Sequence, residues 1–279
     1  MCGIAGWVDF GRDLTQDRAA IVAMTETLRH RGVDASGIWS EGPVTLAHTR
    51  TSVIDLPGGI QPMIAQDNGR PIAVVTFNGE IFNFRELRGE LESRGHKFRT
   101  RSDTEVLLNS YVEWGLDCAN HLEGMFAFGI WDLRSESLVL VRDRFGIKPL
   151  FYQVLPDGGV IFGSEPKTLL AHPATSAVVD LDGLREVFST AKQPGQAVFR
   201  GQQQVRAGHT LTVSRTGIVE REYWALKAKP HTDDLPTTIG NVRTLLEDIV
   251  LEHLEADVPL CTALSGGLDS SAISAIASF

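Results

Sequence analysis

Hydrophobic and polar residues follow two different periods along the chain. Apolar runs of the kind found in strands cover residues 44–56, 70–84, 125–133, 137–143, 149–155 and 159–164. Apolar residues at helical spacing predict helices over 15–32, 83–95 and 101–115. Strands and helices that occur together in this way predict a layered α+β domain through about residue 190.

Residues with capping and turn preferences mark where these elements begin and end. We expect Thr15 to cap the first helix. The third helix opens with the capping-box sequence Ser102-Asp103-Thr104-Glu105. The dipeptide Asn78-Gly79 is suited to positive φ, so it predicts a break within the strand run over 70–84.

The last third of the chain changes in character. Sequence rich in Gly, Pro and Gln predicts a connector over 193–235, whose two short strands, 209–215 and 217–224, pack on the first domain. An amphipathic helix is expected over 233–257. Residues 258–279 then predict a strand, a glycine loop and a helix, which is the start of an α/β nucleotide-binding unit without its body. The predicted domains are 2–192, 193–235 and 236–279.

Half of such a unit leaves apolar side chains with few neighbours. We expect Leu260, Leu264, Ile273 and Ile276 to be poorly covered, which predicts local disorder or association. Complete activity of a nucleotide-dependent enzyme is not expected from this chain, because the parts that close such a sheet and bind the base are missing.

Composition and charge narrow the classes of protein. Hydrophobic residues make up 43% of the 279 positions and charged residues 22%, as in globular domains. No apolar run reaches the ~20 residues of a membrane span, and a secretion signal is absent, so a cytoplasmic location without membrane contact is expected. A net charge of −9 argues against nucleic acid as a partner. Three widely spaced cysteines predict neither a disulfide framework nor a metal site.

Cys2 directly follows the initiator methionine. Removal of Met1 would leave Cys2 with both a thiol and a free α-amine, whose ordinary pKa of ~7.7–8 suits a general base at neutral pH. The alternative is a buried strand cysteine, because free cysteines are among the most buried residues. The dipeptide alone favours the second interpretation.

Eight motifs in order change that balance. They are MCGIAGWVDF, HRGVDASG, RTSVIDL, FNGEIFNF, SDTEVLL, EGMFAFGIWD, RDRFGIKPLFY and FGSEPKTLL. Together they closely resemble the glutaminase domain of class II glutamine amidotransferases, in the asparagine synthetase B branch, over nearly all of residues 2–223. The resemblance implies the four-layer αββα sandwich of N-terminal-nucleophile hydrolases. It also implies hydrolysis of L-glutamine to glutamate and ammonia without a cofactor.

The resemblance gives roles to the residues that would perform the reaction. Cys2 would attack the glutamine carboxamide and form a glutamyl thioester, with its own α-amine moving the proton. Asn78 and Gly79 would form the oxyanion hole. Without the resemblance, Asn78-Gly79 is more simply a hairpin turn.

A second group of residues would hold the substrate. Arg50 would bind the glutamine α-carboxylate through its planar fork, and Asp103 would bind the α-ammonium. Glu80 and the backbone of Val53 and Ile54 match further glutamine contacts. The alternatives are a surface arginine at the head of a strand and an acid that interacts with the dipole of a helix.

The sequence SGGLDSS near the C-terminus resembles the pyrophosphate loop of ATP pyrophosphatases. The resemblance implies an incomplete α/β segment of the ATP-pyrophosphatase type. In a full synthetase reaction this segment would use ATP and Mg²⁺. The alternative is a glycine-rich turn that binds no ligand. Its spacing and its lack of a lysine exclude a Walker A loop. The candidate nucleotide-binding residues are Leu264, Ser265, Gly266, Gly267, Asp269 and Ser270.

The remaining motif residues carry weaker predictions. Lys148 and Glu165 are interpreted as packing or interface residues rather than catalytic ones. Met125 lies where the family begins its ammonia channel, although an ordinary core methionine explains it as well. Val33 replaces the proline of the family's HRGPD motif, which predicts a looser loop.

Several functions remain open from the sequence. The leading hypothesis is the glutaminase half of a glutamine-dependent asparagine synthetase, with aspartate as the acceptor. Rivals are an amidotransferase for another carboxylate acceptor in an antibiotic or surface-sugar pathway, and a truncated, non-catalytic partner or remnant. Relatives of β-lactam synthetases and lasso-peptide cyclases dispense with glutamine hydrolysis; the combination of Cys2, Arg50, Asn78 and Asp103 weighs against them. Either a homodimer or a separate synthetase-domain partner is compatible with the chain.

Overall fold

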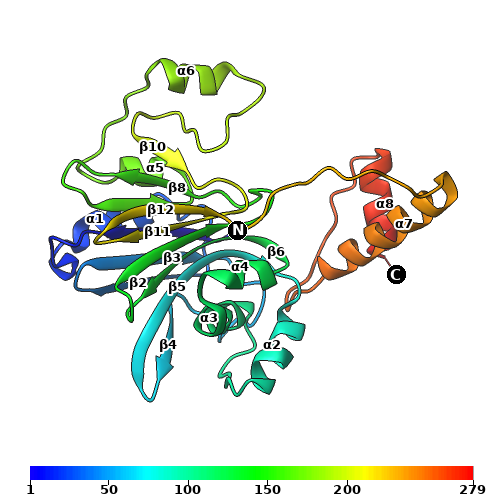
Figure 1. The fold of residues 1–279 in the computed structure, drawn as a ribbon, viewed down its shortest axis with the longest axis horizontal. Helices are drawn as coiled ribbons and strands as arrows, with labels where there is room; N and C mark the ends of the chain where they lie inside the picture. Colours follow the sequence, from blue (N-terminus) through cyan, green and yellow to red (C-terminus); the bar gives the residue numbers. More distant parts are fainter. Residues whose placement is uncertain (279) are drawn as a thin grey trace.

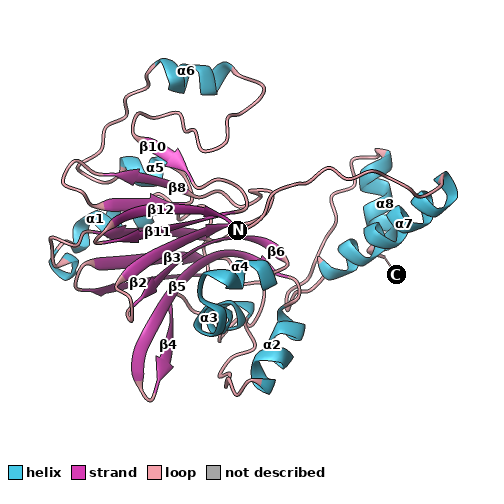
Figure 2. Ribbon diagram, viewed as in Figure 1, coloured by secondary structure: helices cyan, strands magenta, loops and turns pink. Residues whose placement is uncertain are grey.

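The computed structural model describes residues 1–278, and within them two six-stranded antiparallel sheets form the centre of the molecule (Figures 1 and 2). The first sheet has, in spatial order, the strands β10 (Gln202–Gln204), β8 (Phe151–Val154), β9 (Val160–Gly163), β1 (Gly3–Val8), β3 (Val44–Arg50) and β2 (Ala35–Glu41). The second sheet has β12 (Gly217–Glu222), β11 (His209–Ser214), β7 (Ser137–Arg142), β6 (Gly124–Asp132), β5 (Arg70–Ile81) and β4 (Met63–Asp67).

Helices cover the outer face of each sheet. The first sheet carries α1 (Arg18–Glu26) and α5 (Pro166–Leu170). The second carries α2 (Phe84–Ser93), α3 (Asp103–Trp114) and α4 (Cys118–His121). Outside the sandwich, α6 (Leu181–Phe188) sits on a long loop, and α7 (Leu235–Glu252) packs on α8 (Leu268–Ile276) away from both sheets (Figure 1). Across residues 1–278, none of the helices has the length and apolar character needed to cross a bilayer.

Alternation along the central strands produces three apolar layers. On β1, Ile4 and Val8 pack between the two sheets, whereas Ala5 and Trp7 pack against α1. Successive side chains of a strand point to opposite faces, so one strand supplies two cores. The same holds for the second sheet, where Phe126 and Phe128 of β6 pack under α3 and Ala127 faces the first sheet. The layers therefore run helix, sheet, sheet, helix, as the resemblance implied.

The strand β5 corrects the break predicted at Asn78-Gly79. Both residues lie in an unbroken strand and pair with Ala127 and Phe126 of β6, and neither has positive φ. The expected hairpin is absent because the partner strand comes from β6, more than forty residues further along the chain. The strand interpretation of residues 44–56 was also too long, because β3 ends at Arg50 and an irregular segment follows.

The first helix is shorter than predicted and is capped differently. A 3-10 turn over Leu14–Gln16 precedes it, and Asp13, not Thr15, is the capping side chain of that turn. The helix ends at Glu26 because the hydroxyl groups of Thr25 and Thr27 donate to the carbonyls of Ile21 and Met24 and compete for the last turn.

The third helix was predicted well except for the second half of its capping box. Ser102 caps α3 and accepts a hydrogen bond from the Thr104 N–H, as expected. Glu105 accepts instead from the backbone N–H groups of Arg99 and Thr100. The short helices α5 and α6 were not predicted. The edge strands β2 and β4 were not predicted either, because they are partly exposed and carry little periodicity.

The predicted connector belongs more closely to the sandwich than expected. It contributes β10 to the first sheet, where Gln203 pairs with Tyr152 of β8. It also contributes β11 to the second sheet, where Leu211 pairs with Leu140 of β7. These strands are hydrogen-bonded members of both sheets rather than elements packed upon them.

The segment 258–264 contradicts the strand predicted there, because it forms no strand and belongs to neither sheet. No neighbouring strand within the described residues offers it hydrogen-bond partners, and a strand is stable only as part of a sheet. As predicted, Leu260, Leu264 and Ile273 are exposed, whereas Ile276 is half-buried. Most of the apolar stripe of α7 is exposed as well, with Val250 as the buried exception.

Candidate active site

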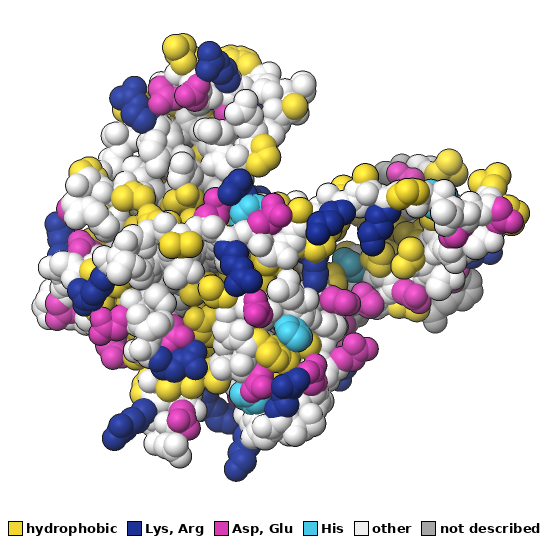
Figure 3. Space-filling view, in the orientation of Figure 1, with side chains coloured by type: hydrophobic (Ala, Val, Ile, Leu, Met, Phe, Trp, Pro, Cys, Tyr) yellow, Lys and Arg dark blue, Asp and Glu magenta, His cyan; other side chains and the backbone are white. Residues whose placement is uncertain are grey.

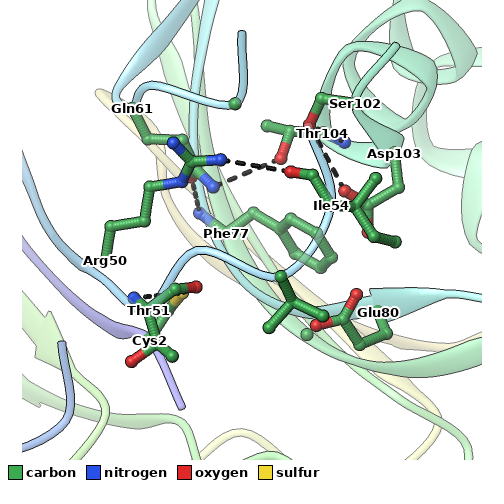
Figure 4. A pocket seen from close by; sticks show the side chains of 13 residues that line it. Cys2, Arg50, Thr51, Ile54, Gln61, Phe77, Glu80, Ser102, Asp103 and Thr104 are labelled. Atoms are coloured by element: carbon green, nitrogen blue, oxygen red, sulfur yellow. Dashed lines mark hydrogen bonds between the residues drawn. The ribbon is translucent and has the colours of Figure 1, made fainter. Parts of the chain in front are cut away.

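One pocket brings together residues that lie far apart in the sequence. It lies where β1 begins, where β3 gives way to the following loop, along the second half of β5, and at the start of α3. The space between these elements is about 300 Å³, and part of it is open to solvent. Figure 4 shows Cys2 and Thr51 at one side of it and Glu80 and Asp103 at the other. Its lining residues are Cys2, Arg50, Thr51, Val53, Ile54, Gly59, Gln61, Phe77, Gly79, Glu80, Ser102, Asp103 and Thr104.

The Cys2 thiol is held by a single neighbouring residue. Its Sγ donates to the Thr51 carbonyl at 3.5 Å and accepts from the Thr51 N–H at 3.4 Å. Burial raises the pKa of the thiol, and the Thr51 N–H and the N-terminal ammonium only partly oppose this. The thiol is therefore protonated at neutral pH and needs a base before it can act as a nucleophile.

The side chain of Asn78 is a buried donor without a partner. Its exposure is 1%, and its Nδ2 makes no hydrogen bond within the described residues. By alternation it faces the first sheet with Thr76, whose hydroxyl donates to Ala47 of β3. Unpartnered buried donors are rare because they cost about 1–3 kcal/mol. Asn78 itself does not line the pocket, although its neighbours Phe77 and Gly79 do.

Gly79 is required by close contact rather than by a turn. A Cβ at this position would lie 2.2 Å from the Met125 carbonyl oxygen of β6. The absence of a side chain keeps β5 and β6 paired at the pocket wall. This is a different reason from the positive φ that the sequence suggested.

Arg50 organises the loop that follows it. The guanidinium is almost fully buried and donates to the carbonyls of Leu56 at 2.6 Å, Asp55 at 2.8 Å and Ile54 at 3.1 Å. Asp55, which has a φ of +46°, accepts from the N–H of Arg101 at 2.7 Å through its carboxylate. Arg50 is therefore a lining residue of the pocket and also the support of the wall that carries Val53 and Ile54.

Two carboxylates face the pocket opposite Cys2. Asp103 is almost fully buried in the first turn of α3 and accepts from the Ile81 N–H at 3.2 Å. Burial raises the pKa of Asp103, and burial together with the charge of Asp103 raises the pKa of Glu80. The Lys148 ammonium opposes the second of these shifts. Two acids whose charged forms are disfavoured make a site that a bound cation would stabilise.

Several residues of the site were missed by sequence reasoning. Gln61 is buried; its Oε1 accepts from the Phe77 N–H at 2.7 Å and its Nε2 donates to Thr104 Oγ1 at 3.3 Å, which joins β5 to α3. Thr51 holds the thiol, and Asp55 holds the loop. Only Asp55 carried a signal, because it opens the turn-forming run DLPGG.

Hydrogen bonds of Asp34 fix the loop that contains Val33. Val33 itself is 81% exposed and does not line the pocket. The adjacent Asp34 donates its N–H to the Arg50 carbonyl at 3.0 Å and accepts from the Ser52 N–H at 2.7 Å. These bonds provide an anchor that does not depend on the missing proline.

The segment after α7 reaches back to the pocket wall. Asp257 donates its N–H to the Val53 carbonyl at 2.9 Å and accepts from the Asp55 N–H at 2.8 Å. A second cavity of about 540 Å³ opens between this segment and the sandwich, and it shares Val53, Ile54 and Glu80 with the first. Met125 lines it and is not a core residue.

The candidate nucleotide loop lies apart from both cavities, at the start of α8 (Figure 1). Gly266 has a φ of +84°, Gly267 caps the helix, and the hydroxyl groups of Ser265 and Ser270 lie 2.9 Å apart. The side chain of Leu264 is exposed. The loop is thus formed, and its residues line neither of the two cavities.

The two-sheet fold and the residues of the pocket are those expected of a glutamine amidotransferase domain, and comparison with known families gives the same class. The chain belongs to the glutamine amidotransferase domain family, whose model matches residues 1–224. The asparagine synthase family model matches residues 241–279.

Curated relatives point to particular enzymes. The glutamine-hydrolyzing asparagine synthetase 3 of Bacillus subtilis is 47% identical over 99% of this chain and 45% of its own length. Asparagine synthetase B of Escherichia coli is 34% identical over 99% of this chain and 44% of its own length. The chain thus spans less than half the length of these relatives.

Solved structures confirm the fold class. A glutamine phosphoribosylpyrophosphate amidotransferase of B. subtilis, in complex with ADP and GMP, gives a TM-score of 0.58 at 19% identity, over 80% of this chain and 49% of its own. The allosteric regulatory enzyme of purine biosynthesis gives 0.61 at 18% identity, over 98% and 63%. The four-layer sandwich of N-terminal-nucleophile hydrolases is therefore the fold of this chain.

Proposed function

We propose that this chain hydrolyses L-glutamine to glutamate and ammonia, as the glutaminase half of a glutamine-dependent asparagine synthetase. The observation that carries the proposal is the pocket itself. A thiol, an arginine and two acids converge there from four separate elements, and the unpartnered amide of Asn78 lies on the strand β5, which also supplies Glu80. The sequence relatives share the whole length of this chain and are named for glutamine hydrolysis.

The pocket complements a zwitterionic amino acid. We assign Arg50 to the α-carboxylate, because a guanidinium has five donors and the loop carbonyls use only part of that set. Asp103 and Glu80 are assigned to the α-ammonium, whose charge would favour the ionised form of both acids. Val53 and Ile54 would contact the substrate through the loop that Arg50 supports.

Cleavage of the amide would follow from the groups around Cys2. Sγ attacks the carboxamide carbon, and the new oxyanion accepts from Asn78 Nδ2 and the Gly79 N–H. The thiol proton passes to the α-amine of Cys2, freed by removal of Met1, and then to the leaving nitrogen, so that ammonia departs and a thioester remains. Water then hydrolyses the thioester to glutamate. These steps draw on protein groups and water alone.

The rest of the synthetase reaction is proposed on family grounds. ATP and Mg²⁺ would activate aspartate, and the loop containing Leu264, Ser265, Gly266, Gly267, Asp269 and Ser270 would contact the phosphates at the N-terminus of α8. The second cavity, with Met125, would receive the ammonia. A cytoplasmic location and a homodimer belong to the same proposal.

Glutamate release from the purified chain tests the glutaminase proposal. We expect release from the wild type and none from Cys2→Ala, and mass spectrometry should show that Met1 is absent. Wild-type release that survives in Cys2→Ala, or the absence of release from a folded wild type without Met1, would contradict the proposal.

Two asparagine variants separate catalysis from stability. Asn78→Ala should lower kcat about 100- to 1000-fold, because it removes one oxyanion donor. Asn83 is the matched control, because its side chain lies outside the pocket and bonds the His121 carbonyl and the Glu123 N–H. Asn83→Ala should keep kcat and lower the free energy of unfolding by about 1–3 kcal/mol. Equal kcat in the two variants would remove Asn78 from the oxyanion hole.

A further inference from the structure

A second polar cluster contacts the Cys2 carbonyl through a residue that does not line the pocket. Its centre is Arg31, whose side chain is only 8% exposed. The Arg31 Nε donates to the Cys2 carbonyl oxygen at 2.9 Å, and its Nη1 donates to Glu165 Oε1 at 2.8 Å. One guanidinium thus connects the backbone of the proposed nucleophile to a carboxylate more than 160 positions away in the sequence.

Glu165 is fixed with respect to the strand that carries Cys2. It directly follows Ser164, whose N–H donates to the Ile4 carbonyl at 3.0 Å and whose hydroxyl accepts from the Ile4 N–H at 3.0 Å. The carboxylate also accepts from His30 at 2.9 Å and pairs with Lys167 at 3.1 Å. Burial alone would raise the pKa of Glu165, but bonds from Arg31, Lys167 and His30 outweigh it and hold that pKa at about 2.

The other end of the cluster reaches the thiol and the N-terminus. The Arg31 carbonyl accepts from Thr51 Oγ1 at 2.8 Å, and the Thr51 N–H donates to Cys2 Sγ at 3.4 Å. The same Thr51 hydroxyl accepts from the N-terminal ammonium of Met1 at 3.2 Å. Arg31 therefore connects Glu165 to the Cys2 carbonyl and, through Thr51, to the Cys2 thiol.

We infer that Glu165 is a positioning residue for the Cys2 nucleophile and acts through Arg31. This inference rests on the glutaminase function proposed above, and it revises the interpretation of Glu165 as a packing residue. The physical reason is charge balance. Arg31 Nη2 already lacks a hydrogen-bond partner within the described residues. Without the carboxylate, the buried guanidinium would turn toward solvent and release the Cys2 carbonyl.

Kinetics of Glu165→Gln test the inference. We expect kcat for glutamine hydrolysis to fall about 10- to 100-fold, because a small displacement of the nucleophile is costly. KM for glutamine should change less than about threefold, because the pocket groups that hold the substrate are untouched. Glu165→Asp keeps the charge but cannot reach Arg31 as closely, so it should also lower kcat, although less than the glutamine variant does.

The chain offers a matched control at the end of α3. Glu113 accepts from one histidine and one arginine, His96 at 2.8 Å and Arg94 at 3.2 Å, as Glu165 does, but it lies outside the pocket. Glu113→Gln should leave kcat and KM unchanged. A kcat for Glu165→Gln equal to that of Glu113→Gln, or a loss that appears in KM alone, would overturn the inference. Should Glu165→Gln fail to fold, a wild-type kcat in Glu165→Asp would overturn it equally.

A measurement independent of glutamine separates this inference from the proposed function. Iodoacetamide alkylates accessible thiols, and the exposed Cys261 provides an internal reference in the same molecule. In Glu165→Gln, loss of the Arg31 bond to the Cys2 carbonyl should raise the alkylation rate of Cys2 relative to Cys261 by at least about threefold. Glu113→Gln should leave this ratio unchanged. An unchanged ratio would overturn the positioning role. The expected change in a chain that releases no glutamate would support it and reject the glutaminase proposal.

Discussion

The polar side chains of the candidate site are largely removed from water. The thiol of Cys2, the amide of Asn78 and the acids Glu80 and Asp103 are all removed from water, and each lacks part of the stabilisation that water would give. Such groups lower the free energy of unfolding of the unliganded chain. A ligand that forms hydrogen bonds or ion pairs with them would bind more tightly for the same reason.

The raised pKa of Glu80 predicts a pH dependence of stability. The folded state binds the Glu80 proton more tightly than the unfolded state, so stability is highest below the ordinary glutamate pKa and falls as pH rises through the raised value. Glu80→Gln should therefore raise Tm by a few degrees at neutral pH, and the gain should vanish at about pH 4. Thermal melts of the unliganded chain across this range measure the effect.

Glu113 is a control whose pKa is shifted in the opposite direction from that of Glu80. His96 and Arg94 lower the pKa of Glu113, so its contribution to stability is present at neutral pH and is lost in acid. Glu113→Gln should lower Tm at neutral pH and not near pH 2. A Glu80→Gln variant that behaves like Glu113→Gln would show that Glu80 is stabilised in its charged form.

Among the elements, β5 shows why local sequence preference failed. Asn-Gly is a strong turn signal in isolation, yet here the dipeptide continues a strand, because β6 pairs with it residue by residue. The helix α3, by contrast, was predicted from its own residues, because its N-cap and its periodicity are local. Elements whose stability depends on distant partners are the ones that sequence pattern describes least well.

Two glycine substitutions test the account of β5. Gly79→Ala should lower the free energy of unfolding by about 1–3 kcal/mol, because the new Cβ meets the Met125 carbonyl at 2.2 Å. Gly89→Ala in α2 is the control, because no atom lies within 4 Å of its Cβ position. It should stabilise the chain by about 0.5–1 kcal/mol through helix propensity. Denaturant unfolding measures both, and a stable Gly79→Ala would contradict the close contact.

The whole molecule divides between a two-sheet body and a helical pair. The body holds all three apolar clusters, whereas α7 and α8 expose most of their apolar side chains. Figure 3 shows acidic and basic side chains interspersed over the visible face, with hydrophobic side chains visible on these two helices and also on the body. The link between the two parts at the pocket wall includes Asp257, which bonds Val53 and Asp55.

Two shortened chains test where the body ends. A chain of residues 1–234 retains every strand, so it should fold and keep kcat, with KM for glutamine raised about tenfold by the loss of the Asp257 bonds. A chain of residues 1–192 lacks β10, β11 and β12, which complete both sheets, so it should not fold. Circular dichroism and glutamate release measure both. A folded 1–192 chain would restore the predicted boundary at 192.

The sequence by itself determined the class of fold. Its motifs also pointed to Cys2, Arg50 and Asp103, which line the pocket, and to Asn78, which does not. The tertiary structure decided how these groups are held. The Arg50 contacts with the loop, the Asp257 bonds and the chain of contacts from Glu165 through Arg31 to Cys2 join positions that are distant in sequence or follow no periodic pattern. No local pattern encodes such contacts, because they exist only once the two sheets have stacked.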